Sequence, residues 1–137
     1  MSPAHAALKH YAAVQVQANV TEATPHRLTA LLFEGALDRI ARAKGHLVRG
    51  ELAPKGELIS AVIAIVGELA GSLNRAAAPQ LVDRLAALYD YVLRLLGEAN
   101  AGNRAEPLDE ASRLLGTLAD AWQAIDPAIP TAQVANG

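Results

Sequence analysis

The chain has 137 residues, a formal net charge of −2 and no cysteine. That length suits one domain with a core large enough to fold without disulfides. The lack of cysteine excludes disulfides, thiolate metal sites and cysteine nucleophiles. The slightly negative charge excludes the broad basic surface of proteins that bind nucleic acid or anionic lipid. Aromatic residues make up only 4% of the chain, so the core must consist mainly of leucine, alanine, valine and isoleucine.

Residues 1–23 are predicted to form an arm that precedes the folded domain. Polar residues such as His5, Lys9 and His10 interrupt its apolar residues, so the segment lacks the continuous apolar run of a signal peptide. A cytoplasmic protein is therefore expected. The weak alternation VQVQANV at residues 14–20 is interpreted as a short helix or an extended arm.

A first helix is predicted at residues 25–48. Thr24 can cap its free N–H groups, and Pro25 loses nothing at the first helical position by lacking an N–H. Gly50 marks its end. His26 falls in the first turn, where a solvent-exposed side chain is expected.

Three more helices are predicted at residues 56–74, 79–100 and 108–125, separated by short segments rich in glycine, asparagine and proline. Short connections place neighbouring helices antiparallel. Pro127 and Pro130 end regular structure, and residues 126–137 are predicted to be a disordered tail. The predicted fold is all-α: an antiparallel up-and-down four-helix bundle at residues 24–125, preceded by a short N-terminal arm or helix.

The helix at residues 56–74 has two faces with little charge. One face carries the large aliphatic side chains that a bundle core needs, and the other carries small residues with Glu68 as the lone charge. Two internal glycines each cost about 1 kcal/mol of helix stability relative to alanine. Either a neighbouring helix covers this small face, or the face is a groove that receives an amphipathic helix from another chain.

The residue pattern of the helix at residues 79–100 favours the second alternative, a groove that receives a helix from another chain. Tyr89 and Tyr91 are two residues apart and cannot both face the core, so Tyr91 is assigned to the surface, where tyrosine is favoured at interfaces. Leu88 and Leu95 lie at one flank of the core face. The predicted partner-binding groove consists of Ala61, Ala64, Ile65, Gly67, Glu68, Gly71, Leu88, Tyr91 and Leu95.

The run LAALYDYVLRLLGEAN at residues 85–100 resembles the third-helix signature of the FliS family of flagellin-specific export chaperones. TPHRLTALLFEGALDRIARAK at residues 24–44 is similar to the family's first helix, and GELAGSLN at residues 67–74 and Trp122 also fit. The resemblance covers about residues 10–125. It departs at Phe33-Glu34, where the family usually has Tyr-Asp, and at NRAAAPQ in residues 74–80, which replaces an acidic turn.

The resemblance implies a cytoplasmic chaperone for the disordered C-terminal segment of flagellin. The segment folds into helices in apolar grooves of the chaperone, which prevents premature polymerisation and delivers flagellin to the flagellar type III secretion apparatus. The resemblance also implies that the export-gate protein receives the complex. An N-terminal arm around Tyr11 and Val14 is expected to fold back over part of the groove.

Other functions find less support in the sequence. None of the four histidines follows a carboxylate by three residues, as the di-metal sites of helical bundles require, and no catalytic motif is present. No enzyme, metal or cofactor is therefore expected. The uncharged stretches are shorter than the roughly 20 residues of a membrane span. The expected oligomeric state is a monomer or weak homodimer, and a self-associating homodimeric adaptor remains the alternative to an export chaperone. A carrier of a small hydrophobic ligand would need an enclosed cavity.

Overall fold

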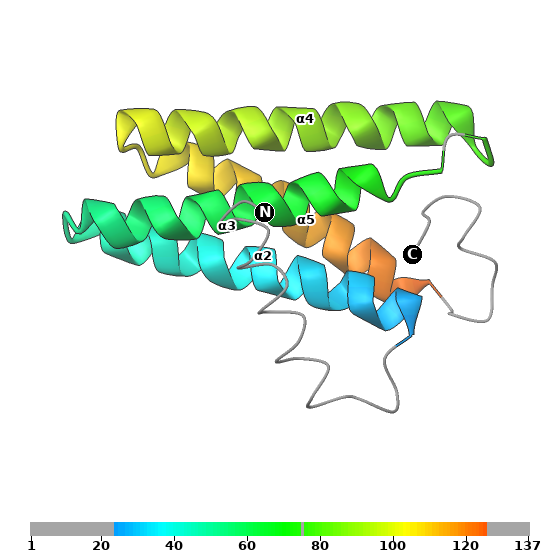
Figure 1. The fold of residues 1–137 in the computed structure, drawn as a ribbon, viewed down its shortest axis with the longest axis horizontal. Helices are drawn as coiled ribbons and strands as arrows, with labels where there is room; N and C mark the ends of the chain where they lie inside the picture. Colours follow the sequence, from blue (N-terminus) through cyan, green and yellow to red (C-terminus); the bar gives the residue numbers. More distant parts are fainter. Residues whose placement is uncertain (1–23, 75, 126–137) are drawn as a thin grey trace.

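The computed structural model describes residues 24–74 and 76–125. Within them it contains four α-helices, α2 (Pro25–Val48), α3 (Leu52–Gly71), α4 (Pro79–Gly102) and α5 (Glu106–Ala124). The helices run in alternating directions, and α5 crosses behind α3 from the end of α4 towards the start of α2 (Figure 1). The predicted all-α antiparallel four-helix bundle is confirmed. The arm expected at residues 1–23 and the tail expected at residues 126–137 lie outside the described residues.

The four helices form a ring in which each contacts two others. Contacts join α2 to α3, α3 to α4, α4 to α5, and α5 back to α2. Among the described residues, no Cα atom of α2 comes within 8 Å of α4, and none of α3 comes within 8 Å of α5. A side chain on the flank of one helix can therefore face only one particular neighbour.

Helix α2 begins as its sequence predicts. The Thr24 hydroxyl oxygen accepts a hydrogen bond from the Arg27 backbone N–H at 3.0 Å, and Pro25 occupies the first helical position. The helix ends at Val48, and Gly50 follows with a φ of +77°. That left-handed conformation favours glycine because it has no Cβ.

The later boundaries differ from the prediction by a few residues. Helix α3 begins at Leu52 rather than at residue 56 and ends at Gly71 rather than at residue 74. Pro54 lies in its first turn, where a missing N–H removes no helical hydrogen bond. Helix α4 continues to Gly102 and stops where Asn103 adopts a φ of 52°. Helix α5 begins two residues early, at Glu106, again with a proline in its first turn.

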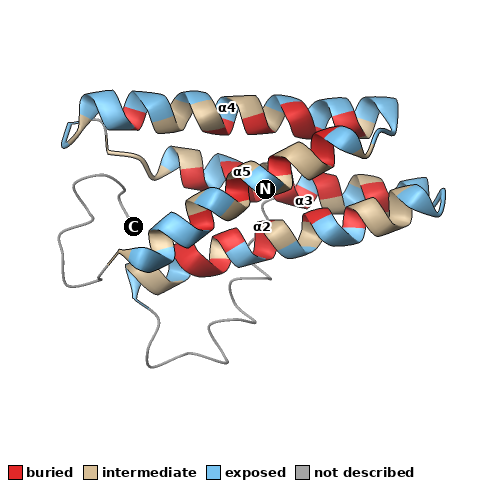
Figure 2. Ribbon diagram, turned by 180° about the vertical axis from the view of Figure 1, so that it is seen from behind, coloured by how far each residue is buried: buried red, intermediate tan, exposed pale blue. Residues whose placement is uncertain are grey.

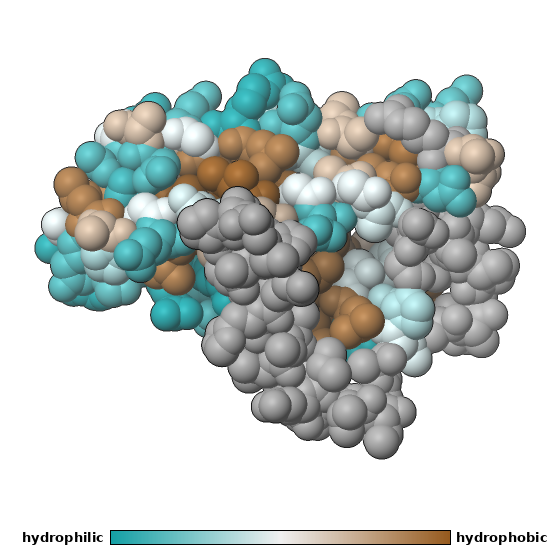
Figure 3. Space-filling model, in the orientation of Figure 1, coloured by the Kyte–Doolittle hydropathy of each residue, from teal (hydrophilic) through white to brown (hydrophobic). Residues whose placement is uncertain are grey.

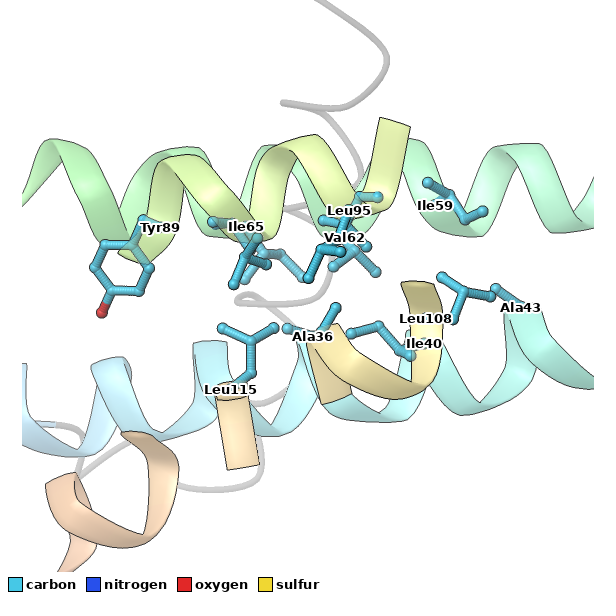
Figure 4. Close-up of a cluster of buried hydrophobic side chains, with 14 of the residues drawn as sticks. Ala36, Ile40, Ala43, Ile59, Val62, Ile65, Tyr89, Leu95, Leu108 and Leu115 are labelled. Carbon is cyan, nitrogen blue, oxygen red and sulfur yellow. The ribbon is translucent and has the colours of Figure 1, made fainter. Parts of the chain in front are cut away.

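The core lies between the helices and consists almost entirely of aliphatic side chains. Buried residues face the interior of the ring, and the outer edge of α4 is largely exposed (Figure 2). Burying one such side chain fully contributes about 1.5–3 kcal/mol to stability. Figure 4 shows side chains from several helices meeting in this cluster. The fully buried large residues are Ile59, Val62, Ile65, Val66, Val82, Val92, Leu96, Leu108 and Leu115.

A buried lysine joins two helices at one end of the bundle. Lys55, near the start of α3, is only 5% exposed. Its ammonium group donates to the Asn100 backbone oxygen at 3.1 Å and to the Asn100 side-chain oxygen at 2.8 Å. The positive charge lies at the C-terminal end of α4, where the helix dipole favours a cation. Lys55 thus ties the start of α3 to the end of α4.

Candidate binding site

An apolar pocket of about 250 Å³ opens at the end of the bundle where α2 begins and α5 ends. Helix α5 runs obliquely towards α2 in this region, while α4 follows the opposite side of the bundle (Figure 1). Side chains of all four helices therefore surround the pocket. Its lining consists of Thr29, Phe33, Leu69, Ser72, Leu73, Leu81, Leu85, Tyr89, Leu118, Ala121, Trp122 and Ile125.

The few polar groups of this lining leave its apolar character intact. The Ser72 hydroxyl donates to the Leu69 backbone oxygen at 2.9 Å, so it is satisfied within its own helix. Burial raises the pKa of Tyr89 to about 12, so the phenol stays uncharged even in alkaline solution below that pH. The pocket therefore suits apolar side chains better than a charged ligand.

Trp122 is paired with His26 beside the pocket. The indole and imidazole rings are stacked, with centroids 4.9 Å apart and an angle of 14° between their planes. The indole N–H donates to the His26 backbone oxygen at 2.9 Å, and His26 Nε2 lies 2.9 Å from the Trp122 backbone oxygen. The expectation of a solvent-exposed His26 is wrong, because this pairing leaves the residue only partly exposed.

The small face of α3 is open. Gly67, Glu68 and Gly71 are exposed, and Ala64 is half-buried. A Cβ atom added at Gly67 or Gly71 would meet nothing within 4 Å. No neighbouring helix in the described part of the chain therefore covers these glycines.

Three of the residues predicted for the groove belong to the core instead. Ala61, Ile65 and Leu95 are 6%, 0% and 5% exposed, and Figure 4 shows Ile65 and Leu95 within the buried cluster. Their assignment to an open surface is corrected. Each lies at the edge of its helix's core face, where a neighbouring helix covers it.

The structure also separates the α4 part of the predicted groove from the α3 part. The Tyr91 hydroxyl donates a hydrogen bond to Glu110 of α5, and this bond raises the pKa of Tyr91. The flank of α4 that carries Tyr91 and the half-buried Leu88 therefore faces α5. Because α5 does not contact α3, this flank and the small face of α3 are two surfaces.

Figure 3 shows where apolar residues reach the surface on the α3 side of the molecule. They gather over the middle of α3 and α4, and again at the end of the bundle where α4 begins. Among the large side chains, Leu28, Val48, Leu52 and Leu81 are exposed. Leu81 also lines the pocket, so the apolar surface continues from the pocket onto the exterior.

The described part of the chain offers no site for a metal ion and no helix that could span a membrane. It contains no cluster of three or more histidine, aspartate or glutamate side chains that could hold a metal ion. None of its helices combines the length and the apolar character that crossing a membrane requires.

Comparison with known proteins identifies relatives of this sequence. The family model described as "Flagellar protein FliS" matches residues 7–129. The chain belongs to the FliS family. It is 40% identical over 119 residues to the flagellar secretion chaperone FliSB of Pseudomonas aeruginosa, covering 87% of this chain and 94% of the relative. It is 37% identical over 121 residues to the flagellar secretion chaperone FliS of Salmonella typhimurium, covering 88% and 90%.

Membership of the FliS family confirms the resemblance drawn from the motifs at residues 24–44, 67–74 and 85–100. The relatives are named secretion chaperones, a class of proteins that is not defined by catalysis. A role in flagellar export therefore follows for this chain at the level of the family.

The sequence interpretation missed the pocket, although Trp122 was recognised as a family feature. Thr29, Phe33, Leu81 and Trp122 come from three helices, and no single helical pattern shows that they meet. One signal was available in the sequence. Leu81 follows Pro79 in the first turn of the predicted helix, and an apolar side chain at a helix start can extend a surface that binds a partner. The structure leaves it 45% exposed.

Proposed function

We propose that this chain binds the C-terminal segment of flagellin in the cytoplasm, prevents its premature polymerisation and delivers it to the flagellar type III secretion apparatus. The proposal joins the family's role in secretion to an apolar pocket at which all four helices meet. The pocket is the observation that carries it, because an apolar ligand is what its lining accommodates. The export-gate protein is proposed to receive the complex of chaperone and flagellin.

A long client that folds as it binds explains why the proposed contact surfaces are spread over several helices. The pocket is lined by all four helices, the small face belongs to α3, and the remaining flank belongs to α4 next to α5. Ordering a disordered segment costs about 1–2 kcal/mol per residue for its backbone. Burying about 1,000 Å² of apolar surface contributes roughly 25 kcal/mol, so a client that wraps over several surfaces offsets much of its ordering cost.

The proposed contact residues are the accessible members of the predicted set. Ala64, Gly67, Glu68 and Gly71 form the smooth surface of α3, where a helix can approach closely, and Leu88 and Tyr91 form the second surface beside α5. Tyr11 and Val14 are proposed to cover part of the client surface when flagellin is absent.

The substitution Gly67→Leu tests the small face directly. A Cβ at this position meets nothing within 4 Å, so the bundle should remain folded while the new side chain blocks close approach of a client helix. We expect the Kd for the flagellin C-terminal segment to rise about tenfold or more, as one lost close contact of about 1.4 kcal/mol would cause. Calorimetric titration measures it, and circular dichroism checks the fold. Ala64→Glu should act in the same direction.

The matched control is Gly116→Leu on α5. A Cβ at Gly116 also meets nothing within 4 Å. Gly116 lies seven residues after Asp109, which pairs with Lys44 of α2, so it is on the side of α5 away from α4 and the proposed surfaces. This variant should bind as the wild type does. Equal binding by Gly67→Leu and the wild type would remove the small face of α3 from the client site.

A further inference from the structure

The reciprocal pairing of His26 and Trp122 has an unusual effect on the end of α5. The last carbonyl groups of a helix have no partner within the helix. The Trp122 carbonyl is one of these and lies 2.9 Å from His26 Nε2, with the Ile125 backbone N–H also donating to it at 3.2 Å. An imidazole that carries hydrogen on Nε2 donates to this oxygen. The first turn of α2 thereby caps the last turn of α5, as histidine near a helix C-terminus can do.

That capped turn is part of the pocket wall. Ala121, Trp122 and Ile125 line the pocket on the α5 side. The hydrogen bond that joins α5 to α4, from Tyr91 to Glu110, is twelve residues away from Trp122, or about 18 Å along a helix. The His26 contact therefore acts at the pocket itself.

We propose that His26 is a positioning residue for the client: it holds the last turn of α5 in place as a preformed wall of the apolar pocket. The inference rests on the proposed function, since the ligand in question is the flagellin segment. A preformed wall does not have to become ordered when the ligand binds. The free energy spent on ordering a binding site lowers its affinity for the ligand. Without the His26 donor the last turn of α5 frays, and the pocket must be assembled during binding.

Three substitutions separate the two contributions of the imidazole. His26→Ala removes both the donor and the stacked ring, and we expect a Kd for the flagellin C-terminal segment about tenfold higher. His26→Gln keeps an N–H donor that can reach the Trp122 carbonyl, and it should restore affinity to within about threefold of the wild type. His26→Phe keeps a stacked ring without the donor and should bind as weakly as His26→Ala.

The control is Lys55→Met at the opposite end of the bundle. It also removes side-chain hydrogen bonds that join two helices, so it lowers global stability without touching the pocket. We expect its affinity for the flagellin segment to equal that of the wild type. If Lys55→Met weakens binding as much as His26→Ala does, the effect is general destabilisation and the positioning role is overturned.

A second readout reports on the turn itself. Amide hydrogen exchange at residues 122–125 should accelerate in His26→Ala and His26→Phe but not in Lys55→Met. Trp122 is the chain's only tryptophan, so quenching of its fluorescence by acrylamide should increase in the same two variants. Unchanged exchange and quenching in His26→Ala would overturn the inference.

A further experiment distinguishes a failure of the proposed function from a failure of this inference. If the wild type does not bind the flagellin segment, that function is wrong, and the uncharged dye Nile red serves as the apolar probe of the pocket. Weaker dye binding by His26→Ala, with Lys55→Met unchanged, would then support the positioning role. Equal dye binding by His26→Ala and the wild type would overturn it.

Discussion

Tyr89 and Tyr91 show how two residues of one type, two positions apart, take different environments. Tyr89 turns towards the interior and lines the pocket, whereas Tyr91 turns towards α5 and donates to Glu110. The spacing predicts that only Tyr89 faces the core; Tyr89 is 5% exposed, but Tyr91 is half-buried and packs against the edge of the same core rather than lying fully at the surface. The pKa of both residues is raised, by burial at Tyr89 and chiefly by the hydrogen bond to Glu110 at Tyr91.

Replacing Tyr89 by phenylalanine should reduce the protein's sensitivity to alkali. Burial raises the pKa of Tyr89 from 10.0 to about 12, so the folded state keeps the phenolic proton after the unfolded state has lost it. The stability contributed by the neutral phenol is intact below pH 10 and is lost as pH rises from 10 towards 12. The loss approaches about 1.4 kcal/mol per pH unit.

Urea denaturation at a series of pH values measures this effect. Between pH 10 and 12, the free energy of unfolding should fall more steeply for the wild type than for Tyr89→Phe. Parallel pH dependences would show that the Tyr89 phenol ionises as readily in the folded as in the unfolded protein.

Two other residues show what the sequence could not predict at this scale. Lys55 falls just before the predicted start of the helix at residue 56, yet it is buried because Asn100 supplies two oxygens from a distant helix. His26 reads as an exposed residue of a first turn, yet it stacks on Trp122. In both cases the partner is remote in the chain, and a local pattern contains no information about it.

At the scale of single helices, the sequence predicted which face is small but not what each flank contacts. Ala61 and Gly67 were assigned to one surface because both are small and lie opposite the large aliphatic residues. In the bundle Ala61 is buried and Gly67 is exposed. The width of the buried face depends on how closely the two neighbouring helices approach, which the pattern of one helix does not specify.

Gly67→Ala should stabilise α3. The new methyl group meets nothing within 4 Å, and alanine is favoured over glycine in a helix interior by about 0.5–1 kcal/mol. We expect the free energy of unfolding in urea to increase by about that amount. The matched control is Gly50→Ala, which should be destabilising because Gly50 has a φ of +77°. A loss of stability in Gly67→Ala would mean that the small face is packed rather than open.

At the scale of the whole molecule, the order and antiparallel arrangement of the helices were predictable, but the pocket was not. Proline, glycine and asparagine mark the ends of the helices. Together with the short connections, they were enough to predict the bundle. The pocket depends on the course of α5 relative to α4 and α2 (Figure 1). That course results from packing among all four helices at once, so no segment of the sequence encodes it alone.

Removing residues 1–18 tests the proposed relation between the arm and the client surface. The described helices begin at Pro25 and should form without these residues, so the helical signal in circular dichroism should be nearly unchanged per molecule. If Tyr11 and Val14 cover part of the client surface, the truncated chain no longer has to release them. Its Kd for the flagellin C-terminal segment should then be equal to or lower than that of the full chain.

Calorimetric titration of both chains, with sedimentation equilibrium on each, decides the outcome. A truncated chain that binds more weakly would show that residues 1–18 hold the client rather than cover its site. Sedimentation guards against another explanation, because uncovering an apolar surface can also promote self-association. If the truncated chain dimerises while the full chain stays near 14.3 kDa, the covered surface also fits a second copy, and the arm's role is to keep the chaperone monomeric until flagellin arrives.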